Sequence, residues 1–130
     1  MIFSLAIYGA PYSSQAAYSA LRFAEAVIRQ GHSIHRLFFY TDGVHCGTAL
    51  ACPPQDELNL QQSWQQLIER HKLDAVVCIA AGQKRGVISE GEAKRFGKPA
   101  FNLAPGFELA GLGQLADAVA HSDRVITFGG

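Results

Sequence analysis

Short apolar runs alternate along the chain with segments in which apolar residues recur every three or four positions. The first run, Ile2–Tyr8, is almost continuously apolar and stops at Gly9 and Pro11, which is typical of a β-strand covered on both faces. Runs of this kind favour a mainly parallel sheet. The expected strands are Ile2–Tyr8, Ile34–Tyr40, Asp74–Ala80, Lys98–Ala104 and Arg124–Phe128.

Four segments between these runs have helical spacing. Ser13 or Ser14 is expected to cap the first helix, whose apolar residues recur until Gly31 ends it. Ser89, followed three residues later by Glu92, has the spacing of a capping box. The other expected helices are Asn59–His71, Ser89–Phe96 and Leu112–His121.

This order of elements predicts an α/β fold, a three-layer α/β/α sandwich with a mainly parallel sheet of about five strands and right-handed crossovers. A chain of 130 residues has the length of one domain, which we take as residues 1–130. In such sheets the functional groups gather where strands end and helices begin. A site is therefore expected at the carboxyl edge of the sheet.

The composition restricts the classes of partner. Hydrophobic residues make up 48% of the chain and charged residues only 17%, so part of the apolar surface is expected to meet a partner chain. The formal net charge is zero, and no direct binding of nucleic acid is expected. No apolar run approaches the ~20 residues of a membrane helix. The three cysteines lack a CxxC pair, which fits a reducing cytoplasm.

One cysteine lies where the site is expected. In the stretch DAVVCIAAGQKRGV, Cys78 stands towards the carboxyl end of the third expected strand. The small residues after it leave space beside the sulfur, and Lys84 and Arg85 can supply positive charge to a thiolate or persulfide. Buried cysteines also serve as small hydrophobic residues in strands. These residues alone therefore support both a reactive and a structural thiol.

The segment VCIAAGQKRGVISEGEAKRFG resembles the active-cysteine region of the TusD/DsrE sulfurtransferases, and it is closest to TusD. GAPYSSQAAYSALRFAEAVIRQGH is similar to the first loop and helix of that family, and LFFYTDGV to its second strand and turn. FELAGLGQLADAVAHSDRVITF is similar to its C-terminal helix and strand. The resemblance covers essentially the whole chain.

The resemblance implies a sulfur relay. Cys78 would accept a persulfide sulfur from a TusA-like donor and pass it to a TusE-like acceptor, and the sulfur would end in the 2-thiouridine of tRNA wobble positions. The alternative end point is dissimilatory sulfur oxidation, as in DsrE-like proteins. TusB-like and TusC-like subunits would complete a heterohexamer. The exchange requires no metal or other cofactor, and we assign none.

Other candidate residues have plainer interpretations. Lys84 and Arg85, with backbone N–H groups after the strand, are candidates for holding a sulfur anion, but they could equally form a solvated basic turn. Cys46 and Cys52 lie in the irregular segment TDGVHCGTALACPPQDE and are interpreted as ordinary loop thiols. Trp64 lies on an apolar helical stripe and is expected in the core or a subunit contact.

Two further patterns yield no site. Gly9 to Gln15 lies between a strand and a helix, as phosphate loops do, but it lacks their glycine and lysine pattern and is interpreted as a capped turn. The five histidines are scattered in the sequence, and no metal site is assigned. Two rival functions stay open, a non-catalytic scaffold subunit and a flavodoxin-like module that binds a small ligand.

Overall fold

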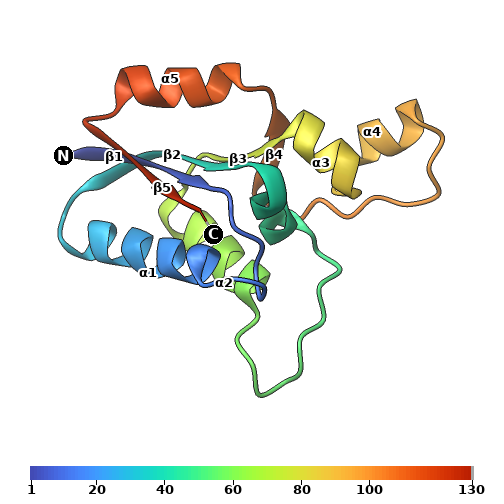
Figure 1. The fold of residues 1–130 in the computed structure, drawn as a ribbon, viewed down its shortest axis with the longest axis horizontal. Coiled ribbons are helices and arrows are strands. Elements are labelled where there is room, and N and C mark those ends of the chain that lie inside the picture. Colours follow the sequence, from blue (N-terminus) through green and yellow to red (C-terminus); the bar gives the residue numbers. More distant parts are fainter. Residues whose placement is uncertain (130) are drawn as a thin grey trace.

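The computed structural model describes residues 1–129 and is built on one sheet of five parallel strands (Figure 1). The strand order is β4-β3-β2-β1-β5. All neighbouring strands run parallel, so their carboxyl ends share one edge. The strands are β1 (Ile2–Ile7), β2 (Ser33–Phe39), β3 (Ala75–Cys78), β4 (Phe107–Ala110) and β5 (Arg124–Phe128).

Helices cover both faces of the sheet. In Figure 1, α5 lies on one side of the strands and α1 and α2 lie on the other, while α3 and α4 extend beyond the ends of β3 and β4. The expected three-layer α/β/α sandwich is thereby confirmed. The helices are α1 (Ala16–Arg29), α2 (Leu60–His71), α3 (Ile79–Arg85), α4 (Glu90–Arg95) and α5 (Gly113–His121), and η1 (Thr41–Gly47) is a 3-10 helix.

The core lies mainly between the sheet and the helices α1 and α2. The three alanines that α1 turns to the sheet, at positions 17, 20 and 24, are completely buried, and their small side chains allow a close approach of helix to sheet. Trp64 of α2 is also buried and packs edge-to-face on Phe39, with ring centroids 5.3 Å apart. Of the two roles expected for Trp64, the structure selects the core.

The fourth strand lies later in the sequence than expected. Lys98–Ala104 is not a strand, and its β-type pairing is an isolated antiparallel bridge between Leu103 and Thr48. Pro99 within the segment and Pro105 directly after it lack backbone donors, which disfavours its joining the sheet. The sheet is continued by β4, whose Phe107 is buried and pairs with Ala75 of β3.

The third strand ends earlier than expected, at Cys78, and the chain continues directly into α3. The residues after the cysteine, IAAGQKR, include good helix formers, and Gly86 ends the helix with a positive φ of 75°. Half of the expected capping box is present at Ser89, whose hydroxyl accepts from the N–H of Glu92, whereas the Glu92 carboxylate accepts from Gln83. The cap expected for α1 differs, because Gln15 occupies its N-cap position and Ser14 accepts only from the N–H of Ala16.

Arg36 of β2 connects α5 to the sheet. Its Nε donates to Asp74 at 2.8 Å, and its Nη1 donates to Asp117 of α5 at 2.7 Å and to the carbonyl of Gln114 at 2.9 Å. The hydrogen bonds from His35 and from Arg36 hold the pKa of Asp117 below its usual range. No helix among residues 1–129 has the length and apolar character that a membrane span requires.

Candidate functional site

Cys78 is the last residue of β3 and the N-cap residue of α3. It pairs with Ala110 of β4 and therefore stands at the carboxyl edge of the sheet, where the sequence predicts it. Its thiol is free, and the residue is only 2% exposed. The side chain makes no cap hydrogen bond to α3. A thiol in this position is well placed for chemistry at the strand ends, but it is shielded from bulk solvent.

The neighbouring strand ends are covered by η1, which follows β2 and packs against α3. The N–H of Gly43 in η1 donates to the carbonyls of Tyr8 and Tyr40, which lie just beyond β1 and β2. Within α3, a Cβ at Gly82 would come within 2.7 Å of the carbonyl oxygen of Val87, which follows the helix. Close packing against η1 and against the chain after the helix therefore holds α3 at this edge of the sheet.

Three segments around this edge are joined by Asn102. Its side-chain oxygen accepts from the N–H of Ile88 at 3.0 Å, and its Nδ2 donates to the hydroxyl of Thr48 at 2.8 Å. The N–H of Asn102 donates in turn to the Ile88 carbonyl. One asparagine thus fixes the chain after α3, the chain after η1 and the segment before β4 relative to one another.

Lys84 and Arg85 lie in the last turn of α3, at the opposite end of the helix from Cys78. The expected basic turn is therefore part of a helix, which places the pair about 10 Å along its axis from the cysteine. Arg85 donates to Asp42 of η1 at 2.8 Å and to the Ala81 carbonyl at 3.2 Å, and it holds the pKa of Asp42 below its usual range. Lys84 is exposed. We propose that the pair acts on a sulfur anion only through its long-range field.

This proposal predicts a small, salt-sensitive effect. In a Cys52→Ser background at neutral pH and low ionic strength, the double variant Lys84→Gln/Arg85→Gln is expected to alkylate Cys78 about twofold more slowly with neutral iodoacetamide, because the pair no longer stabilises the thiolate. Anionic iodoacetate should be slowed further, because the pair no longer attracts the reagent. The matched control is Lys94→Gln/Arg95→Gln, because that basic pair also ends a helix. Equal iodoacetate rates in both double variants would leave the backbone amides after β3 as the candidates for holding the anion.

The other two cysteines differ sharply in exposure. Cys46 of η1 is completely buried, and burial raises the pKa of its thiol to about 12. Its thiolate is therefore strongly disfavoured at neutral pH. Cys52 is exposed in the segment between η1 and α2, and its Sγ donates to the Leu50 carbonyl. The prediction that Cys46 is an ordinary loop thiol is wrong, because Cys46 lies in η1 and is buried in the core.

An open groove of about 800 Å³ lies between α1 and α2, away from the thiol. Arg22 and Arg70 line it together with Glu25 and Glu57, so its charges are balanced and select no anion. Cys78 is not among the lining residues. The groove includes Ser13 to Gln15 of the turn before α1. The interpretation of this turn as an ordinary start of a helix stays a prediction.

Two histidines that are far apart in the sequence meet in the structure. His35 of β2 and His121 of α5 both contact Asp117, with their ring centroids 5.7 Å apart. Histidines that are scattered in the sequence are thus brought together by the fold. Their separation of more than eighty residues left no local pattern that could have revealed the contact. By contrast His45, beside Cys46, lies half-buried in η1.

Comparisons with known proteins agree with this architecture. A sequence model of the DsrE/DsrF-like family matches residues 1–128. The sulfurtransferase TusD homolog of Pseudomonas aeruginosa is 51% identical over 130 residues, which are 100% of this chain and 98% of the relative. DsrE of Allochromatium vinosum is 49% identical over 129 residues, 99% of each chain. The crystal structure of the ychN protein from E. coli has a TM-score of 0.76 at 27% identity and covers 98% of this chain and 97% of its own.

The likeness extends over nearly the whole chain and is not confined to the cysteine segment. The names of the relatives bear out the sulfurtransferase activity that the sequence predicts, and the structural neighbour bears out the fold. The chain therefore belongs to the DsrE/DsrF-like family.

Proposed function

We propose that this sulfurtransferase carries a persulfide on Cys78, received from a TusA-like donor and passed to a TusE-like acceptor. The observation that supports this most directly is the position of Cys78, a free thiol at the carboxyl edge of β3 in a chain similar to TusD and DsrE along its full length. Cys46 is a poorer candidate because it is fully buried and its pKa is about 12. Cys52 lies outside the secondary structure elements.

The reaction is an exchange at sulfur. The Cys78 thiolate attacks the outer sulfur of the donor persulfide, a new S–S bond forms, and the donor cysteine leaves as a thiolate. Cys78 then carries the outer sulfur as a persulfide. An acceptor cysteine attacks that sulfur in the same way and releases the Cys78 thiolate. Both steps conserve atoms and electrons, so no external oxidant or reductant is consumed.

The burial of Cys78 limits access to its sulfur. A residue that is 2% exposed is poorly accessible to small thiols and to a partner's cysteine alike, so transfer requires the packing around the start of α3 to open. Ala80, in the first turn of α3, is exposed and has a small side chain. An incoming cysteine on a flexible segment can therefore approach over Ala80 more easily than over a bulky residue.

Partner subunits belong to the same proposal. We propose assembly with TusB-like and TusC-like chains in a heterohexamer, in the cytoplasm, and the support for a partner surface is the exposed apolar area of the isolated chain. Such area on a small protein often marks an interface. The most exposed large apolar side chains include Tyr12, Leu50, Phe96, Phe101, Leu112 and Val119.

The 2-thiouridine of tRNA is the proposed end point of the relay. Sulfur oxidation is the second candidate, because the identity to DsrE of Allochromatium vinosum, 49%, is nearly the same as the 51% to the TusD homolog. The chemistry on Cys78 is the same for both. The two end points differ only in the acceptor that receives the sulfur.

A reconstituted relay tests the proposal. The chain is co-expressed with TusB-like and TusC-like subunits, and the complex is incubated with a cysteine desulfurase, cysteine and a TusA-like donor. The peptide DAVVCIAAGQK is expected to gain the mass of one sulfur atom, and a reductant is expected to remove it. A TusE-like acceptor added next should take the sulfur, as followed by intact mass.

The outcomes separate the parts of the proposal. Sulfur on the peptide without transfer to the TusE-like chain would contradict that acceptor, and transfer to a sulfite-reductase-associated acceptor would favour sulfur oxidation. Sulfur that appears only on Cys52 would contradict the role of Cys78. A chain that stays a monomer at high concentration in the presence of both partners, measured by size exclusion with light scattering, would contradict the assembly.

A further inference from the structure

A β-bulge in β2 turns two successive side chains towards α5. β1 and β2 pair Phe3 with Ile34 and then Ser4 with Arg36, so His35 is an extra residue without a partner in β1. In a regular strand, neighbouring side chains point to opposite faces. The bulge removes that alternation, and both His35 and Arg36 reach Asp117 of α5. Bulges often redirect a side chain in this way next to functional sites.

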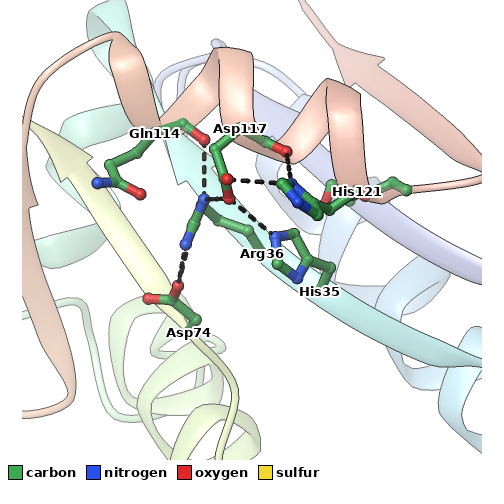
Figure 2. Close-up of polar contacts among 8 residues, drawn as sticks. His35, Arg36, Asp74, Gln114, Asp117 and His121 are labelled. Carbon is green, nitrogen blue, oxygen red and sulfur yellow. Dashed lines mark hydrogen bonds and ion pairs between the residues drawn. The ribbon is translucent and has the colours of Figure 1, made fainter.

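Figure 2 shows the resulting cluster, with His35 and His121 both directed at the Asp117 carboxylate and the Arg36 guanidinium on its other side. His35 Nε2 lies 3.1 Å from Oδ2, and His121 Nδ1 lies 3.0 Å from Oδ1. One ligand atom from each of the three residues lies within 4.8 Å of the others. All three side chains are partly open to solvent, so an ion could enter.

The spacing suits a small divalent ion. Zinc lies about 2.0–2.2 Å from imidazole nitrogen and carboxylate oxygen, so the ligand atoms of a tetrahedral site lie about 3.4 Å apart. The nitrogen–oxygen separations of 3.1 and 3.0 Å, which involve different oxygens of Asp117, are slightly shorter than this distance. The remaining adjustment falls on the His121 ring, whose side chain is 63% exposed at the end of α5. To bind a metal through Nδ1, the His121 ring must carry its proton on Nε2 and give up the contact that Nδ1 now makes with the Asp117 carbonyl at 2.9 Å.

The charges around the cluster are compatible with a cation. Arg36 is the nearby positive group, and its Nε and Nη2 both lie within 2.8 Å of one oxygen of Asp74. Arg36 also pairs with Asp117 at 2.7 Å, so two carboxylates face one guanidinium and the group keeps a net negative charge. Arg36 also holds the Asp117 carboxylate in place through Nη1. Ligating carboxylates are commonly oriented by such hydrogen bonds.

We propose that His35, Asp117 and His121 form a binding site for a divalent transition metal ion such as Zn²⁺, with water completing the coordination. The site lies near the start of β2 and the end of α5, at the opposite edge of the sheet from Cys78. It is therefore separate from the sulfur chemistry. Its ligands come from a strand and a helix, so the bound ion links α5 to the sheet and stabilises the folded chain.

Metal binding is tested on the purified chain carrying Cys52→Ser, which removes the exposed thiol as a competing ligand. Titration with Co²⁺ is expected to give a saturable visible d–d spectrum at one ion per chain, without a thiolate charge-transfer band. Zn²⁺ should displace the Co²⁺ and raise the midpoint of thermal unfolding. His35→Gln and His121→Gln are each expected to weaken binding at least tenfold and to remove the thermal shift.

His71→Gln is the matched control, because His71 is also an exposed histidine in the last turn of a helix. It should bind Co²⁺ and Zn²⁺ as the parent does. Circular dichroism without metal verifies that each variant is folded, and glutamine retains hydrogen-bonding capacity beside Asp117. Failure of the parent to bind saturably, a thiolate band as the main signal, or equal binding by His121→Gln and His71→Gln would each overturn the site.

Discussion

Replacing Cys78 with alanine or serine is expected to abolish sulfur loading of the chain. Neither side chain can form a persulfide, so the loss should be complete and not a partial reduction in rate. Two replacements are useful because Cys78 is buried. A serine hydroxyl without a partner in the core costs about 1–3 kcal/mol, whereas alanine removes the sulfur without adding a polar group. Both variants should retain the fold and the assembly with partner chains.

The measurement is the sulfur mass on this chain and on a TusE-like acceptor after incubation with a cysteine desulfurase and a TusA-like donor. Cys52→Ser and Cys46→Ala are the controls for the other thiols. Cys52→Ser should transfer sulfur at the parent rate, and Cys46→Ala should do so after allowance for any loss of stability from its fully buried position. Onward transfer by a folded Cys78→Ala complex would make the strand cysteine structural. Loss confined to a control variant would move the active thiol there.

The position of Cys78 could be predicted because it depends on local pattern. An apolar run that stops at a cysteine and small residues identifies the end of a strand, and strand ends meet at one edge of a parallel sheet. The environment of Lys84 and Arg85 could not be predicted in the same way. A helix of only seven residues has too few positions to show a period, so α3 read as the end of a strand and a turn.

The fourth strand shows a second limit of prediction from the sequence. Lys98–Ala104 and Phe107–Ala110 are both short and partly apolar, and periodicity does not separate them. What decides between them is pairing with β3, in which Cys78 and Ala75 align with Ala110 and Phe107. Such pairing is a tertiary contact. Pro99 inside the first segment and Pro105 directly after it are the local signal that would have argued against it.

The histidine cluster depends on contacts that no local pattern encodes. Its formation requires a bulge in β2, a helix whose C-terminal end returns to the start of that strand, and an arginine that fixes Asp117. Neighbouring residues of a regular strand are expected on opposite faces of the sheet, and the bulge breaks this alternation at His35. His35 and Arg36 therefore could not be assigned to one face from the sequence.

Gly43→Ala is expected to destabilise the chain by about 3 kcal/mol through a backbone clash. A Cβ at this position would overlap the carbonyl group of Ile7, the last residue of β1. That carbonyl cannot easily move, because it accepts from the N–H of Tyr40 at 2.9 Å and so helps to join β1 to β2. Gly43 itself donates to the carbonyls of Tyr8 and Tyr40, so withdrawing η1 would break further hydrogen bonds.

Urea unfolding measures the effect, as a lower midpoint with an unchanged dependence on denaturant. Gly113→Ala is the control, because no other group lies within 4 Å of its added Cβ and the position is helical. Since η1 also carries Asp42, the partner of Arg85 in α3, a displaced η1 should loosen the packing around Cys78. The folded Gly43→Ala chain should therefore alkylate Cys78 faster than the parent, and Gly113→Ala should not. A Gly43→Ala chain with the parent's midpoint and alkylation rate would show that η1 does not hold this edge of the sheet.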